Sequence, residues 1–137
     1  MRAVILDTEA VAVLVDPGHS KHRMMVAHLE GLASRARRGV AVVAVVPTAA
    51  RVEAGWDRRT PSAAAINRFR VHDSPLRSSE ADVAAAVHAR TGKGVADSHI
   101  GAVVQGVAAH DDVVVLTSDP DDMTLVASPR RITAVRI

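Results

Sequence analysis

Four acidic residues at well-separated points carry the clearest chemical signal in this sequence. They are Asp7, Glu53, Asp97 and Asp119. Carboxylates that gather in one place repel one another, so they persist only when they are protonated or when a cation neutralises them. Oxygen ligands alone favour Mg²⁺ or Mn²⁺ over softer metals. Such an ion can polarise a phosphodiester and generate hydroxide from water for in-line attack.

Short, continuous apolar runs predict the strands that would carry these acids. The three clear strands cover residues 3–6, 40–46 and 113–116, with a brief strand at 71–72 and a last one over 132–137. Helical patterns lie between them, over residues 8–14, 20–38, 48–56, 60–68, 78–90, 97–110 and 121–127. Buried strands that alternate with helices are typical of a parallel sheet covered on both faces. We therefore predict a single α/β domain over residues 1–137, a three-layer α/β/α sandwich with a mainly parallel central sheet.

The predicted sheet explains why distant acids would meet. In sheets of this kind, ligands bind beyond the carboxyl ends of the strands. Asp7 directly follows the first strand, and Asp119 follows the third clear strand. Glu53 lies in the helix after the second strand, and Asp97 stands at the start of a long helix. We expect all four carboxylates at one edge of the sheet.

Each acid also has a purely structural interpretation. Asp97 and Asp119 are good helix N-caps, and Pro120 suits the first position of a helix. Glu53 is equally well an exposed helix residue. Asp7 is the hardest to explain in this way, because an acid at the end of a buried strand needs a partner. The combination of four acids, rather than any one of them, favours a metal site.

Several small residues predict where the helices begin and end. Ser20 is the expected N-cap of the helix that runs to Gly39, and Ser78 or Ser79 is the expected N-cap of the helix that ends at Gly92. Gly55 falls inside the helix predicted over 48–56, where glycine is costly, so close packing is expected there. Trp56 beside it is expected to anchor the core.

Composition excludes several classes of protein. The chain of 137 residues has no cysteine, which excludes disulfides, thiolate metal sites and a thiol nucleophile. No apolar run approaches the roughly 20 residues that cross a bilayer, so we expect a cytoplasmic protein without a membrane partner. Fifteen of the 17 basic residues are arginine, clustered at 35–38, 58–59, 68–70 and 130–131. Such clusters suit a phosphate backbone, and they suit a solvated surface equally well.

The order of these motifs resembles a known family. The resemblance rests on Asp7-Thr8, Glu53, the segment from Val95 to Ala102 around Asp97, and Thr117-Ser118-Asp119 with Asp122 after it. In this order they resemble PIN-domain ribonucleases, especially the VapC-type toxins of bacterial toxin–antitoxin pairs. The resemblance extends from Asp7 to the final strand.

The resemblance implies Mg²⁺- or Mn²⁺-dependent endonucleolytic cleavage of RNA. It implies that the four acids hold the metal and position the attacking water. It also implies a homodimer and silencing by a cognate antitoxin. The residues expected to support the site are Thr8, Thr117, Ser118 and Asp122.

Three alternatives were weighed against this interpretation. A receiver-like phosphate-accepting domain needs a late lysine, whereas the only lysines are Lys21 and Lys93. A haloacid-dehalogenase-like phosphatase needs Asp-x-Asp after the first strand, whereas this chain has Asp7-Thr8-Glu9. A catalytically silent PIN-like module that binds RNA or a protein partner stays open, because a fold does not by itself decide function.

Overall fold

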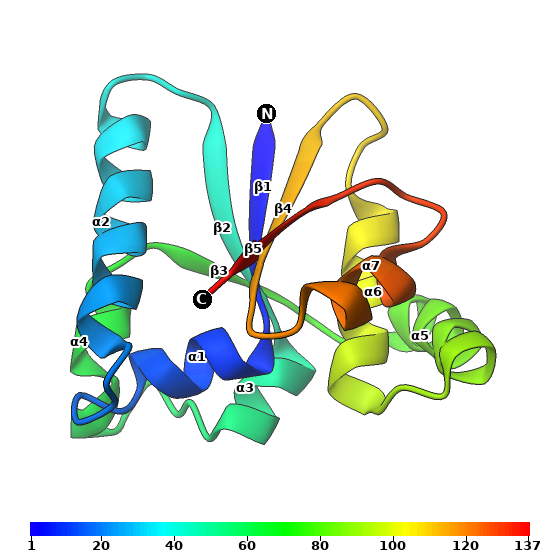
Figure 1. Ribbon diagram of the computed structural model, residues 1–137, viewed down its shortest axis with the longest axis horizontal. Helices are drawn as coiled ribbons and strands as arrows, with labels where there is room; N and C mark the ends of the chain where they lie inside the picture. The colour runs from blue at the N-terminus through cyan, green and yellow to red at the C-terminus, as the bar shows by residue number, and fades with distance from the viewer.

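Five strands form the centre of the computed structural model, which describes residues 1–137. The strands are β1 (Arg2–Leu6), β2 (Val42–Pro47), β3 (Val71–Ser74), β4 (Asp112–Thr117) and β5 (Thr133–Arg136). All neighbours pair in parallel, in the order β3-β2-β1-β4-β5 (Figure 1). The predicted α/β class with a parallel sheet is confirmed.

Helices cover both faces of this sheet. They are α1 (Thr8–Leu14), α2 (His22–Arg37), α3 (Thr48–Ala54), the short 3₁₀ turn η1 (Pro61–Ala63), α4 (Ala64–Asn67), α5 (Ser78–Thr91), α6 (Val95–Gly106) and α7 (Pro120–Ala127). Helices α1 to α4 pack in one apolar cluster and α5 to α7 in another, on opposite sides of the strands (Figure 1). This is the predicted three-layer sandwich. No helix is both long enough and apolar enough to cross a membrane.

Strand β1 is apolar on both faces because it lies at the centre of the sheet. Val4 and Leu6 join the cluster on the α1–α4 side, and Ile5 joins the cluster on the α5–α7 side. Side chains of a strand alternate between its two faces, so a strand covered on both sides reads as one continuous apolar run. That is why the run at residues 3–6 predicted a strand correctly.

The order of the strands places a topological switch point between β1 and β4. The chain steps from β1 to β2 and β3 on one side, and then returns to place β4 on the other side of β1. Leu6 pairs with Leu116 in register, so β1 and β4 end level with each other. The N–H of Asp7 donates to the carbonyl of Leu116 at 3.2 Å. Ligands of open α/β sheets bind at such a switch point, beyond the carboxyl ends of the strands.

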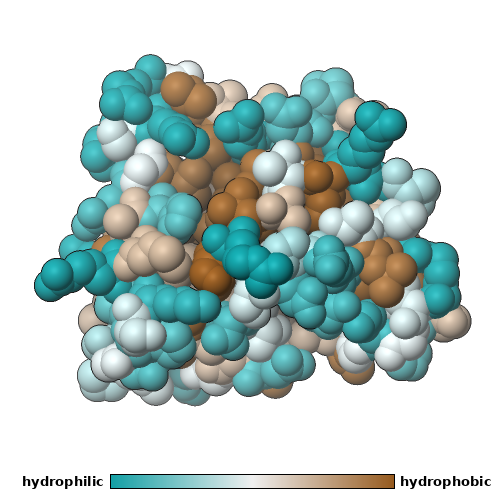
Figure 2. Space-filling view, viewed as in Figure 1, coloured by the Kyte–Doolittle hydropathy of each residue, from teal (hydrophilic) through white to brown (hydrophobic).

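One part of the sheet has no helix over it. A cavity of about 790 Å³ lies between α2 and the strands β1, β4 and β5. Its floor is apolar and includes Val114, Leu116 and Val135. Figure 2 shows this apolar hollow on the face of the molecule that is turned toward the viewer. None of the four candidate acids lines this cavity.

The N-caps predicted at Ser20 and at Ser78 or Ser79 were wrong, although the helix predicted from residue 78 does begin there. Helix α2 begins at His22 with Lys21 as its N-cap residue, and α5 begins at Ser78 with Arg77 as its N-cap residue. Neither N-cap side chain accepts a hydrogen bond from its helix. Ser20 is left in the preceding turn, because the backbone reaches helical geometry two residues later than the side-chain pattern suggested.

Gly55 was predicted to allow close packing inside its helix, which was wrong. Gly92 was predicted to end its helix, which is confirmed. Both glycines end their helices in the left-handed conformation, with φ of 71° at Gly55 and 70° at Gly92. Nothing lies within 4 Å of the position a Cβ would take at Gly55, so close packing is not its role. Glycine is favoured there because it adopts positive φ without steric cost.

Candidate active site

Asp7 stands at the end of β1 with partners on both sides. Its side chain is 6% exposed, and its Oδ1 accepts a hydrogen bond of 2.7 Å from the N–H of Ala10, which caps α1. The hydroxyl of Thr117, at the end of β4, also bonds to this carboxylate. Burial raises the pKa of Asp7 above its usual value, against these hydrogen bonds, and the nearby charges of Asp97 and Glu9 raise it further. Asp7 is therefore both a helix cap and a buried acid facing another acid.

The negative charges of three neighbouring acids act on Asp97. It lies in the first turn of α6, which begins at Val95, so the N-cap interpretation of this residue was wrong. Burial raises the pKa of Asp97, and repulsion from Asp122, Glu53 and Asp119 adds to the effect. These neighbours come from α3, α7 and the loop after β4. Acids from distant parts of the sequence therefore lie close enough for their charges to act on Asp97.

Asp119 is exposed and is a helix N-cap, as its structural interpretation predicted. Its Oδ1 accepts from the N–H of Asp122 at 3.2 Å, in the first turn of α7. The N–H of Asp119 donates to the hydroxyl oxygen of Thr117 at 2.9 Å. Thr117 is fully buried and connects the Asp7 carboxylate to the backbone of Asp119. One hydroxyl therefore sets the relative positions of two candidate acids.

Glu53 lies at the rim of the site rather than inside it. Its side chain is exposed on α3, and it lines a shallow cavity of about 570 Å³ between α3 and the start of α6. Val52 and Val95 in the same cavity are 82% and 68% exposed. Glu53 acts on Asp97 through its charge. A substrate beside Glu53 would meet an apolar surface next to an acidic one.

Lys93 belongs to this cluster, although it was absent from the predicted site. Its Nζ lies 2.7 Å from Oδ1 of Asp122, and the charges of Asp119 and Asp97 also act on it. The hydrogen bond to Asp122 raises the pKa of Lys93. The available signal in the sequence was a rare lysine between two glycines, four residues before Asp97.

The other predicted supporting residues occupy different places. Thr8 follows Asp7, and its buried hydroxyl oxygen has no hydrogen-bond partner. Asp122 pairs with Lys93. The backbone carbonyl of Ser118 accepts from Nη1 of Arg136 at 3.0 Å, and its side chain makes no hydrogen bond with the acids.

The donor set fits a hydrated hard cation. No three histidine, aspartate or glutamate side chains lie close enough together to bind one metal ion directly. Mg²⁺ keeps several of its waters and commonly contacts only one or two carboxylates. The acids at this edge offer only oxygen ligands, and the unpartnered hydroxyl of Thr8 adds a polar atom that lacks a hydrogen bond. Asp7 and Asp97 would hold the ion, with Asp119 and Glu53 completing its surroundings through water.

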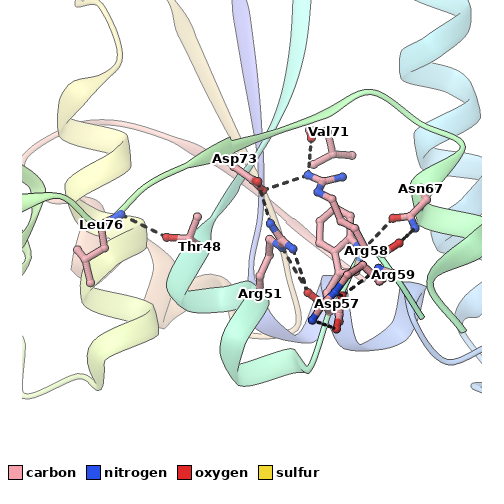
Figure 3. Close-up of polar contacts among 10 residues, drawn as sticks. Thr48, Arg51, Asp57, Arg58, Arg59, Asn67, Val71, Asp73 and Leu76 are labelled. Atoms are coloured by element: carbon pink, nitrogen blue, oxygen red, sulfur yellow. Dashed lines mark hydrogen bonds and ion pairs between the residues drawn. The ribbon is translucent and has the colours of Figure 1, made fainter. Parts of the chain in front are cut away.

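A clasp of charged groups around Trp56 fixes α3, the helix that carries Glu53. Figure 3 shows Arg51 and Arg58 both reaching Asp73 on β3, with contacts of 2.8 and 3.0 Å. Their guanidinium groups lie 5.0 and 4.2 Å from the centre of the Trp56 ring. The indole N–H donates to Oδ1 of Asn67 at 3.1 Å. Trp56 is 3% exposed in the core, which confirms its predicted packing role.

The arginine clusters divide into structural and free groups. Arg130 donates to the carbonyls of Val107, Ala108 and Asp111, and Arg58 belongs to the Trp56 clasp. Arg35, Arg37 and Arg38 are exposed, but they lie at the end of α2 that is remote from the acidic edge (Figure 1).

Comparison with known protein families and with curated proteins finds no match for this sequence. The chemistry of the site is therefore judged on its residues and their geometry.

Proposed function

We propose that this protein is a Mg²⁺- or Mn²⁺-dependent endoribonuclease that hydrolyses RNA phosphodiester bonds at the carboxyl edge of its sheet. The observation that carries the proposal is the convergence of Asp7, Glu53 and Asp119 on Asp97, beside the switch point between β1 and β4. Carboxylates that repel one another in this way must be protonated or neutralised by a cation. Function, rather than stability, is the physical reason to keep such a cluster.

In this proposal, the role of each site residue follows from its burial and its place in the fold. A bound divalent ion would polarise the scissile phosphate and lower the pKa of a water molecule. Asp7 and Asp97 would hold that ion, because they are the more buried acids of the cluster. Thr117 keeps the Asp7 carboxylate and the Asp119 loop in place. Glu53 and Asp119, both exposed, would position the attacking water.

RNA as the substrate, and a toxin as the biological role, rest on the PIN-like order of the motifs. This role brings with it a cytoplasmic location, a homodimer and a cognate antitoxin as the silencing partner. Expression in a bacterium tests it directly. Wild-type protein should arrest growth, and Asp97→Asn should not, at equal protein levels. Undisturbed growth with soluble wild-type protein would refute the toxin role while leaving nuclease activity open.

Cleavage of RNA in vitro tests the catalytic proposal. Structured and unstructured RNA are incubated with Mg²⁺, with Mn²⁺ or with EDTA. We expect metal-dependent cleavage by wild type, and a loss of at least about 100-fold in Asp97→Asn, as for a group positioned to act in the transition state. The matched control is Asp82→Asn, an exposed acid on α5. Equal activity of Asp97→Asn and the control would refute the assignment.

A non-catalytic module that binds RNA or a protein partner is the second candidate. The apolar cavity beside α2 favours it, because that cavity is large and separate from the acids. Binding of RNA without cleavage under every metal condition would make this the leading interpretation.

A further inference from the structure

The backbone of Lys93 is held from both sides by hydrogen bonds. Its carbonyl accepts from Nδ1 of His88 on α5 and from Oγ of Ser98 on α6, the latter at 3.2 Å. Its N–H donates to the hydroxyl oxygen of Thr91 at 3.2 Å. The glycine before it turns the chain at the end of α5, with φ of 70°. These bonds fix the backbone from which the flexible Lys93 side chain extends.

The ammonium group of Lys93 is the positive charge among the site acids. Its bond to Asp122 is the one ion pair made by any of the acids around Asp97. Asp7, Glu53, Asp97 and Asp119 make no ion pair of their own. The chain's other lysine, Lys21, donates to the carbonyl of Ile137, away from this cluster. A single flexible side chain therefore supplies the charge that the cluster needs.

A lysine suits this task better than one of the chain's many arginines. Its charge is a compact, strongly hydrated point on a flexible stem, whereas arginine binds carboxylates in a rigid fork. Lys93 and Asp122 are each about one-third exposed, at 31% and 30%. Ion pairs that solvent reaches are weak, so this one breaks readily when a stronger competitor arrives. A divalent ion carries twice the charge and repels the ammonium.

We propose that Lys93 is the resident counter-ion of the acidic site: it neutralises the carboxylates while no divalent ion is bound, and its ammonium moves away from Asp122 when one binds. The inference rests on the proposed function, because it assumes that this edge takes Mg²⁺ or Mn²⁺. Lys93 is a positioning residue in this scheme. It also weakens metal binding, since the ion must displace it.

The small number of lysines makes the displacement directly observable. In protein labelled with ¹³C and ¹⁵N, the two lysine side chains give two sets of Cε–Hε signals, and Lys93→Met assigns them. During titration with MgCl₂, the Lys93 signals should shift together with the backbone amide of Asp97. The Lys21 signals should stay in place and act as an internal control.

The two ways of failing are distinguishable in the same titration. If the Asp97 amide shifts and the Lys93 side chain does not, Lys93 is not the counter-ion, although the metal site stands. If neither signal responds at millimolar Mg²⁺ or to Mn²⁺, the metal site fails, and both proposals fall with it.

Metal affinity provides a second and independent readout. Calorimetric titration with MnCl₂ should show roughly tenfold tighter binding in Lys93→Met, because a unit charge a few ångströms from the ion is removed. The matched control, Lys21→Met, should bind Mn²⁺ as wild type does. A merely structural Lys93 would lower the melting temperature on substitution without tightening Mn²⁺ binding, and that result would overturn the proposal.

Discussion

Gly101 lies where α6 packs tightly against α7 and α5, and its replacement by alanine tests how the site is positioned. A Cβ at Gly101 would lie 2.6 Å from the carbonyl oxygen of Val126 and 3.0 Å from Cγ1 of Val87. Helix α6 carries Asp97 one turn earlier, and α7 carries Asp122. The absence of a side chain at Gly101 therefore sets the separation of two helices that bring acids together.

The expected cost follows from these distances. The Val126 carbonyl belongs to the backbone, so α7 must retreat by about 0.8 Å to reach an ordinary contact of 3.4 Å. Overpacking of this kind costs about 1–3 kcal/mol. Alanine regains about 1 kcal/mol of helix propensity relative to glycine. Because a carbonyl has no alternative rotamer, we expect an overpacking cost at the upper end of that range, about 3 kcal/mol, and hence a net loss of about 2 kcal/mol.

Thermal unfolding followed by circular dichroism measures this loss. At about 3–5 °C per kcal/mol for a chain of this size, Gly101→Ala should lower the melting temperature by about 6–10 °C. The matched control is Gly31→Ala on α2, an exposed position beside the apolar cavity, where nothing lies within 4 Å of the added Cβ. That variant should gain up to about 1 kcal/mol. If Gly101→Ala melts at or above the wild-type temperature, the close approach of α6 and α7 is wrong.

Three further predictions follow from the charges and turns of the structure. Asp97→Asn should raise the melting temperature in EDTA at neutral pH, because burial and neighbouring acids raise the pKa of Asp97 in the folded state and penalise its charged form. This gain in melting temperature should vanish as the pH falls through the raised pKa toward 3.8, because the wild-type carboxyl is then protonated as well. Asp73→Asn removes both arginine contacts of the Trp56 clasp and should cost about 1 kcal/mol in urea unfolding, which an unchanged midpoint would contradict. Gly55→Ala should cost about 1–2 kcal/mol by the same measurement, because alanine is strained at positive φ; equal stability would show that α3 ends differently.

Local patterns were enough to predict most of the elements. The helix over residues 8–14 has the predicted bounds, and the apolar runs at 3–6 and 113–116 lie within β1 and β4. These assignments succeed because a strand buried on both faces must be apolar throughout, whatever its neighbours are. The N-caps predicted at Ser20 and at Ser78 or Ser79 were wrong for the opposite reason. A capping residue type does not determine where the backbone first becomes helical.

The candidate site, like the fold, was predictable from the sequence only in its local features. The types of its acids and their places after strands could be recognised from the amino-acid sequence, since those features are local. Strand order and register decided that Asp7 meets Thr117, and the contact of α6 with α7 decided that Lys93 pairs with Asp122. Such pairings depend on contacts between residues tens to more than a hundred positions apart in the chain. No local pattern encodes them, because they arise only when the sheet and its covering helices have packed.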